Sequence, residues 1–389
     1  MAFSVYAMLR QLSLSGRLAF LLTGLFVVSP SCVLYENWLY DTFPVAALLT
    51  FSAYALYRHL VGKTCYWSCV FWSLLALIVA TRGTFHIAWF GLVLALLILF
   101  DKPSRKKTIR AALLPFLFCF GLYVKNWVLL GLFSTSSLLG MNFWVMTGEN
   151  LPQAELQRSV NAGELSQLSL IRRFSPIDAY PKEYREVNPF SDVPVLTQTR
   201  RSTGETNYNH FSIVAISRQY LRDGLNVARK HPEAYAKGLI RSTTVYFLSS
   251  SDYALLEPNK TAIARINRLF DRACYGKIPV RWAQLSGRPV FLFILVGLPL
   301  VTVYAFAVGV KGKSVSREQR VLILYLVLNV VYVAGVSNLI EAGENNRMRF
   351  VTDPMTIPLV GLFISRTWAV ALKLKAAFVR RIADGCAWR

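Results

Sequence analysis

Two carboxylates lie close together in the stretch YENWLYDTFP, residues 35–44, between two strongly apolar runs. Glu36 and Asp41 are five residues apart, which sets them about 140° apart on a helix but can bring them together in a turn. A carboxylate at such a place can take a proton from a hydroxyl group as a general base. The structural alternatives are an N-cap for Asp41 and a solvated turn for Glu36. Both residues are therefore candidate catalytic groups.

A second set of side chains is suited to binding an anion. These residues also lie near the ends of apolar runs: Arg82, Lys125, Asn126, Arg347 and Arg349. Arginine suits phosphate because its planar guanidinium donates two parallel hydrogen bonds. Arg82 is the lone basic residue in its turn, and the alternative for it is to extend its charge to a membrane interface. Glu341 and Glu344 are expected to pair with the arginines of their own segment rather than to act as bases.

Metal-binding patterns are weak in this chain. His86, His210 and His231 lack metal-ligand spacing, and no histidine or second cysteine pair accompanies Cys65 and Cys69. No residue is therefore assigned to a metal, and the cofactor stays open, with a divalent metal among the choices.

The elements that must position these side chains are apolar helices. The chain has 389 residues, of which 54% are hydrophobic and only 16% charged, with a mean hydropathy of +0.40. This composition predicts an all-α polytopic membrane protein with about eight spans. The expected spans are residues 17–35, 42–60, 65–81, 84–100, 110–130, 288–310, 320–338 and 351–371.

The positive charge agrees with a membrane location. The net charge of +22 would suggest nucleic acid in a soluble protein, but in a membrane protein the bilayer explains it, and no nucleic-acid partner is expected. Basic residues gather in every second loop: Arg58, Lys63, Lys102, Arg105, Lys106, Lys107, Arg110, Lys311, Lys313, Arg317, Arg320, Lys373, Lys375, Arg380 and Arg381. The bias predicts cytoplasmic termini, and it places both candidate acids outside the cytoplasm.

The expected spans divide the chain into three regions. Residues 1–130 form a five-helix membrane region, residues 131–287 a polar extracytoplasmic insertion, and residues 288–389 a three-helix membrane region with a basic tail. Within the insertion, residues 210–248 have the spacing of two amphipathic helices with a turn near His231 and Pro232. Residues 174–209 are rich in proline and are expected to be loop.

Several of these stretches together resemble the GT-C superfamily of polytopic glycosyltransferases. The similar stretches are SPSCVLYENWLYDTFPVAALLTFSAYALYRHL (29–60), YVKNWVLLGLFSTSSLLGMNFWVMTGENLP (123–152), RQYLRDGLNVARKHPEAYAKGLIRSTTVYF (218–247) and GENNRMRFVTDPMTIPL (343–359). They are similar to those of enzymes that use polyprenyl-phosphate sugars, such as the dolichyl-phosphate-mannose-dependent protein mannosyltransferases. The match starts at a later hairpin of the family, so its usual N-terminal helices are expected to be absent.

The resemblance implies transfer of a sugar from a polyprenyl phosphate to an extracytoplasmic glycan, lipid or protein acceptor at a bacterial inner membrane. It implies catalysis by Asp41 and Glu36, and donor binding by the cationic set. Two alternatives remain open on the residues. A non-catalytic accessory subunit could supply a lipid-binding groove, and a transporter of lipid-linked sugars would be equally apolar and basic, although no inverted repeat supports it.

Overall fold

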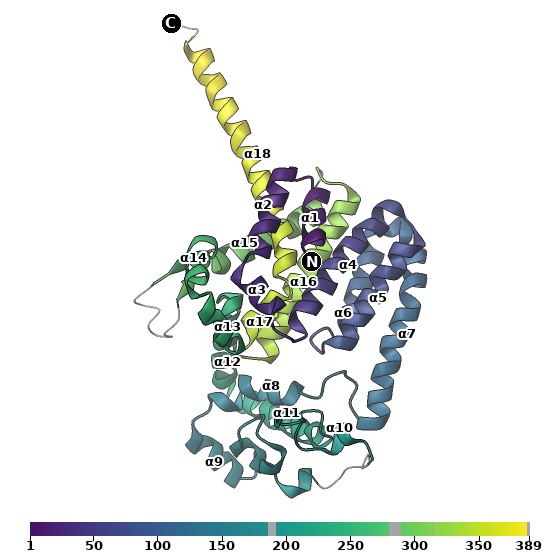
Figure 1. Cartoon of the computed structure of the whole chain (residues 1–389), viewed down its shortest axis with the longest axis vertical. Coiled ribbons are helices and arrows are strands. Elements are labelled where there is room, and N and C mark those ends of the chain that lie inside the picture. Colours follow the sequence, from purple (N-terminus) through teal and green to yellow (C-terminus); the bar gives the residue numbers. More distant parts are fainter. Residues whose placement is uncertain (186–191, 280–288, 313, 387–389) are drawn as a thin grey trace.

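The computed structural model describes residues 1–185, 192–279, 289–312 and 314–386. The expected regional boundary at residues 287–288 and Lys313 lie outside these ranges. Figure 1 shows a bundle of helices with most of the 131–279 insertion at one end and the last turns of the final helix extending from the other. We call the end of the bundle beside the insertion the insertion end.

The apolar segments expected to span the membrane are helical in the described residues. The first part contains α1 (Ala2–Gln11), α2 (Gly16–Val27), α3 (Pro30–Glu36), α4 (Thr42–Gly62), α5 (Cys65–Thr81), α6 (Ile87–Phe100), the 3-10 turn η1 (Lys102–Ser104) and α7 (Arg105–Leu130). The last part contains α15 (Leu292–Lys311), α16 (Arg317–Ile340), α17 (Asn345–Phe350) and α18 (Asp353–Cys386). Large buried side chains such as Trp72, Trp89 and Tyr325 fill the space between these helices. The mostly helical architecture therefore agrees with an all-α membrane protein.

The expected number of eight spans is not confirmed. In the described residues four helices are long and apolar enough to cross a membrane, or five if α2 and α3 form one bent span. These two helices meet at 57°, because Ser29 accepts a hydrogen bond from the amide of Cys32 and Pro30 starts a new helix. Helices α5 and α6 are apolar but have only 17 and 14 residues. Helix α4 is longer but carries Arg58 and His59.

The insertion is built mainly from helices and short turns. Its helices are α8 (Leu139–Met146), α9 (Gln153–Asn161), α10 (Pro194–Thr197), α11 (Ser212–Lys230), α12 (Pro232–Tyr246), α13 (Glu257–Ala262) and α14 (Ala264–Cys274). Its 3-10 turns are η2 (Gly148–Asn150), η3 (Gln167–Leu170), η4 (Ile177–Ala179), η5 (Lys182–Tyr184), η6 (Ser250–Asp252) and η7 (Ala254–Leu256). Strands β1 (Lys277–Ile278) and β2 (Val290–Phe291) pair antiparallel, with Lys277 opposite Phe291. The predicted helix pair with a break at Pro232 is confirmed, and the described part of 174–209 contains only short turns and α10.

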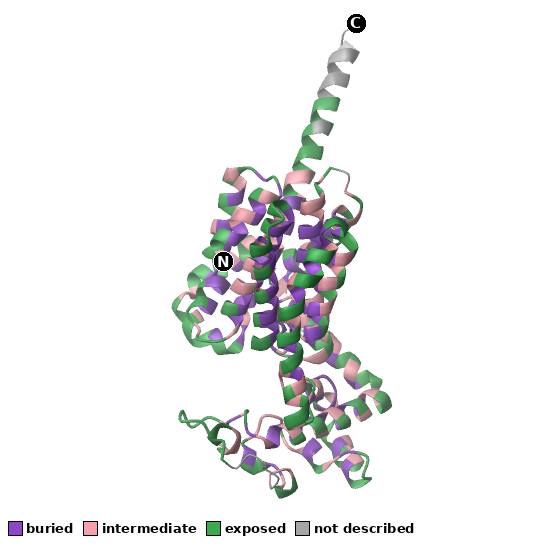
Figure 2. Ribbon diagram, turned by 90° about the vertical axis from the view of Figure 1, so that its right-hand side faces the viewer, coloured by how far each residue is buried: buried purple, intermediate pink, exposed green. Residues whose placement is uncertain are grey.

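Helix α12 joins the insertion to the bundle. On one side Gly238 packs so closely on α8 that a Cβ there would lie 2.2 Å from the carbonyl oxygen of Met146. On the other side the hydroxyls of Tyr235 and Ser242 donate to the carbonyls of Leu339 and Asn338, at 3.0 and 2.9 Å. These carbonyls end α16, where no helical partner exists for them. Figure 2 shows that buried residues gather between the helices of the bundle, with smaller buried groups in the insertion.

Candidate active site

Asp41 and Arg82 form an ion pair at the insertion end of the bundle. Asp41 occupies the N-cap position of α4, but its carboxylate makes no capping hydrogen bond. Its Oδ2 instead lies 3.3 Å from Nη1 of Arg82, the residue that ends α5. Arg82 is only 6% exposed, and its guanidinium also contacts Thr42 Oγ1 at 3.4 Å and Met348 Sδ at 2.8 Å. The pair therefore connects α4, α5 and α17.

The other oxygen of Asp41 is not satisfied by the described residues. Oδ1 is buried and has no hydrogen-bond partner among the described residues. A buried carboxylate oxygen without a partner is costly, so its retention favours a functional role over a purely structural one. Arg82 itself has a lowered pKa, because burial and then the nearby Arg347 disfavour its charge, against the attraction of Asp41.

Arg347 forms the second charged pair at this end. It projects from the short helix α17, pairs with Glu344, and is 6% exposed. Its guanidinium carbon lies 4.9 Å from the ring centre of Tyr40 and 5.2 Å from that of Tyr253. Burial opposes its charge, but Glu344 and the two tyrosines outweigh burial, so the pKa of Arg347 is raised. Arg347 is thus held as a permanent cation between aromatic rings.

Glu341 is a candidate that the sequence did not identify as one. It follows α16, and burial together with the neighbouring carboxylate of Glu344 raises its pKa from 4.5 to about 7, although Arg347, Arg82 and Arg173 act in the opposite direction. The expected pairing with arginine is formed by Glu344, whereas no described cation lies within 4 Å of Glu341. The only signal in the sequence was its position directly after a long apolar helix. We call Asp41, Arg82, Glu341, Glu344 and Arg347 the acid–arginine cluster.

An aromatic wall lines one side of this cluster. The rings of Trp38 and Tyr40 stack with centroids 4.6 Å apart, and Trp38 also contacts Tyr253 at 5.5 Å. The hydroxyl of Tyr253 donates to Glu344 at 2.8 Å, which fixes the orientation of both groups. Tyr40 is 50% exposed, so the wall has a free face beside Arg347. Flat aromatic faces next to charged groups are suited to sugar rings, which present both apolar and polar sides.

Arg349 has a different environment from Arg347. Its guanidinium donates to the carbonyls of Tyr246 and Leu248 at 2.6 and 2.7 Å and to Ser250 Oγ at 2.8 Å. Its Nε also pairs with Asp353 at 3.2 Å. These contacts occupy the guanidinium within the protein and join the end of α12 to α17 and α18. The sequence predicts that Arg349 binds substrate. In the structure its hydrogen bonds are made within the protein and stabilise the fold.

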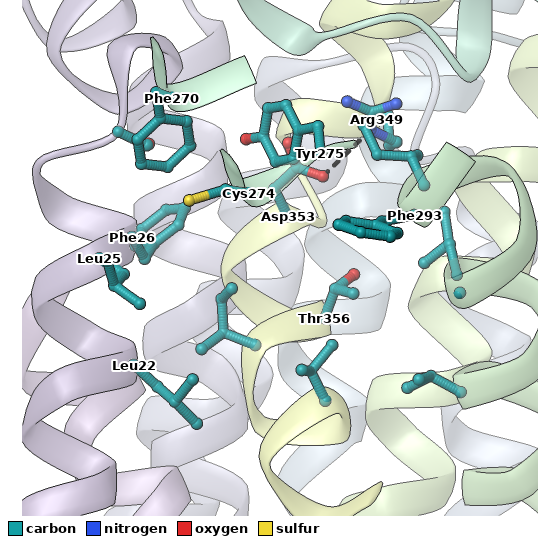
Figure 3. Close-up of a pocket in the computed structure, with 17 residues that line it drawn as sticks. Leu22, Leu25, Phe26, Phe270, Cys274, Tyr275, Phe293, Arg349, Asp353 and Thr356 are labelled. Atoms are coloured by element: carbon teal, nitrogen blue, oxygen red, sulfur yellow. Dashed lines mark hydrogen bonds and ion pairs between the residues drawn. The ribbon is translucent and has the colours of Figure 1, made fainter. Parts of the chain in front are cut away.

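An apolar groove begins beside the Arg349–Asp353 pair. It has a volume of about 320 Å³ and lies between α2, α14, α15 and α18. Figure 3 shows Phe26, Phe270 and Phe293 around it, with the ion pair at one end. The rings of Tyr35 on α3 and Phe350 on α17 stack with their centroids 4.2 Å apart. Helix α17 carries both Arg347 of the acid–arginine cluster and Arg349 at the end of the groove. The groove is thus a hydrophobic site with a polar end.

The remaining predicted residues lie outside the acid–arginine cluster. Glu36 ends α3 and is exposed, and among the described residues it forms no ion pair with Arg82 or Arg347. Lys125 is exposed on α7, also with no such contact to the cluster. Asn126 donates to the carbonyl of Ser134 at 2.7 Å and so orders a loop whose Ser136 packs on Gly83. Asn126 is therefore a positioning residue near Arg82.

The described residues contain no group of three His, Cys, Asp or Glu side chains that could hold a metal ion. The acid–arginine cluster therefore does not offer such a ligand set for a divalent metal. No family model, no curated protein and no solved structure matches this chain.

Proposed function

We propose that this chain is a membrane glycosyltransferase that takes a sugar from a polyprenyl-phosphate donor and transfers it to an acceptor outside the cytoplasm. The observation that carries the proposal is the convergence of three carboxylates, two buried arginines and an aromatic wall from segments far apart in the sequence. Their position between helical bundle and polar insertion suits a reaction with one lipid-borne and one polar reactant.

The proposed reaction requires few groups. The acceptor hydroxyl forms a bond to the anomeric carbon, while the bond from that carbon to the phosphate oxygen breaks and its electron pair leaves with the phosphate. The acceptor proton passes to a carboxylate, and a cation balances the charge on the leaving phosphate. Arg347 is suited to the second role because its charge is stable and its Nε has no partner in the described chain.

Two carboxylates qualify as the proton acceptor. Asp41 has an oxygen without a partner and is oriented by Arg82. Glu341 has a pKa of about 7, near the value at which a general base is most effective. The pH dependence of transfer tests Glu341, since catalysis by Glu341 gives an acidic limb near pH 7.

The apolar groove is the proposed site for part of the polyprenyl chain. Its phenylalanine-rich lining offers the surface that an isoprenoid would bury, and one end lies beside the Arg349–Asp353 pair. Helix α14 adjoins the groove and exposes Ile266 and Leu269, both 62% exposed, next to its arginines. This pattern is typical of a helix lying at a lipid surface, which would keep the groove at membrane depth.

The proposal can be tested by transfer of radiolabel from a polyprenyl-phosphate sugar, with the purified chain in liposomes and a panel of glycan, lipid and peptide acceptors. We expect transfer by the wild type and a loss of at least a hundredfold in Asp41→Asn or Glu341→Gln, the size expected for a lost general base. Equal transfer by the wild type and both variants would exclude the two carboxylates.

A non-catalytic accessory subunit is the second candidate. The observation that favours it is that Arg82, Arg347 and Arg349 each pair with a carboxylate of the chain itself. Such pairs can be wholly structural. Binding of the polyprenyl-phosphate sugar to the wild type without any transfer would support this alternative.

A further inference from the structure

The insertion contains a second cavity, separate from the apolar groove and polar in character. Its volume is about 410 Å³, and it lies between η2, the segment after η3 and helix α12. The lining residues are Glu149, Arg172, Arg173, Phe174, Ser175, Pro176 and Arg241. Three of the seven are arginines, and none of the three was singled out from the sequence.

The charges in this pocket are only partly balanced. Arg173 pairs with Glu149, with Nε and Oε1 2.8 Å apart, and its guanidinium lies 5.0 Å from the ring centre of Phe174. Arg172 and Arg241 are exposed, with no ion pair to the described carboxylates. The hydroxyl of Ser175 donates to the carbonyl of Arg172 at 2.6 Å. The pocket thus offers two arginines in excess of its one carboxylate, together with an aromatic ring. That is a set of donors for an oxyanion beside a surface for a sugar ring.

The backbone at the pocket is held in an uncommon conformation. Phe174 has a φ of +57°, in the left-handed region that a bulky side chain rarely adopts, at a cost of about 1–2 kcal/mol. The hydroxyl of Tyr208 donates to the carbonyl of Phe174 at 2.8 Å, and the two rings meet edge to face at 5.4 Å. These contacts hold the strained residue in place, so that Arg173, Phe174 and Ser175 all line the cavity.

The pocket is coupled to the acid–arginine cluster through α12. Arg241 lines the pocket, while the next residue, Ser242, donates to the carbonyl of Asn338 at the end of α16. Glu341 directly follows α16, and Arg173 is close enough to act on the charge of Glu341. The pocket residue Arg173 is thus within electrostatic range of one candidate base, Glu341.

We propose that the pocket of Arg172, Arg173 and Arg241 binds a phosphate monoester carried by the acceptor, and so selects phosphorylated acceptors. This inference rests on the proposed function only in that the ligand is called an acceptor. The binding of phosphate itself does not require transfer activity. A water-soluble sugar phosphate and a phosphorylated lipid headgroup both present this group to the arginines.

Binding can be measured without any transfer, with the full chain in phosphatidylcholine nanodiscs. One arm titrates glucose 6-phosphate, with glucose as the uncharged match. The other arm replaces part of the phosphatidylcholine by phosphatidic acid. In both arms the readout is the rise in thermal unfolding temperature that a ligand of the folded state produces.

The informative variant is Arg172→Gln with Arg241→Gln, because both side chains are exposed and their loss should leave the fold intact. Its control is Arg222→Gln with Arg229→Gln on α11, which removes the same charge from exposed positions outside the pocket. We expect a roughly tenfold or greater loss of affinity per pocket arginine for the phosphate probe, and little change in the control.

A response to glucose 6-phosphate alone identifies a soluble glycan phosphate, and a response to phosphatidic acid alone identifies a lipid headgroup. Equal binding by wild type and pocket variant in both arms, or an equal loss in the control, would overturn the inference. Failure of this binding with transfer intact would leave the proposed function standing. Phosphate binding without any transfer would refute the proposed glycosyltransferase activity and leave the phosphate site standing.

Discussion

Replacing Glu341 by Gln should change how stability depends on pH. Its pKa is 4.5 for an unperturbed side chain and about 7 in the folded protein, because burial and Glu344 disfavour the charged form. The folded state then binds this proton more tightly than the unfolded state does. The contribution of protonated Glu341 to the free energy of unfolding is fully present below about pH 4.5, and it is lost as the pH rises through about 7. The difference of roughly 2.5 units corresponds to about 3 kcal/mol.

The assay is the thermal unfolding of the purified chain in detergent between pH 5 and 9, where the exposed Glu205→Gln serves as the control. Relative to the wild type, Glu341→Gln should raise the unfolding temperature at pH 8 and 9, and much less at pH 5. Glutamine keeps the shape of the protonated acid and carries no charge to be desolvated.

Two results would refute this reasoning. If wild type and Glu341→Gln lose stability in parallel from pH 5 to 9, Glu341 does not titrate in that range. If Glu205→Gln shows the same gain at high pH, the gain does not come from the burial of Glu341, since removing an exposed carboxylate from a chain of net charge +22 should not stabilise it.

Three further outcomes are expected. Asp41→Asn should lower the free energy of unfolding by about 2 kcal/mol, since it leaves Arg82 buried beside a neutral amide. Chemical unfolding checks this, because the double variant Asp41→Asn/Arg82→Met should lose less stability than Asp41→Asn alone. If Glu341 is the base, the pH–rate profile of transfer should show an acidic limb near pH 7, which Glu341→Gln abolishes together with most activity; a profile without that limb would count against Glu341. Gly140→Ala should reduce the yield of folded protein, since a Cβ there would lie 1.7 Å from the carbonyl oxygen of Ser217, whereas Gly91→Ala meets nothing within 4 Å; size-exclusion profiles of the two variants compare them directly.

The sequence predicted local structure well where one physical property dominates. Apolar runs become helices because an apolar environment requires backbone groups to pair internally, and Pro232 breaks the α11–α12 pair because proline cannot continue a helix but can begin one. The predicted number of spans is not confirmed, because hydropathy windows do not register where Ser29 and Pro30 bend a segment, or how short α6 is.

The candidate site was predictable only in part. The charge pattern singled out Asp41, Arg82 and Arg347, and the structure brings them to one end of the bundle. It leaves Glu36 and Lys125 outside the acid–arginine cluster, because spacing along the chain does not define which face of a packed helix a residue occupies. Arg349 shows the same limit, since its partners are carbonyls about a hundred residues away.

By itself, the sequence indicated an all-α membrane protein, the positions of its helical segments and the gathering of charge at their ends, because composition and periodicity are local properties. Only the tertiary structure decided which charges meet, that Glu341 titrates near neutral pH, and that Arg172, Arg173 and Arg241 share a pocket. Those features depend on burial and on distances between segments separated by tens to hundreds of residues, and packing alone sets them.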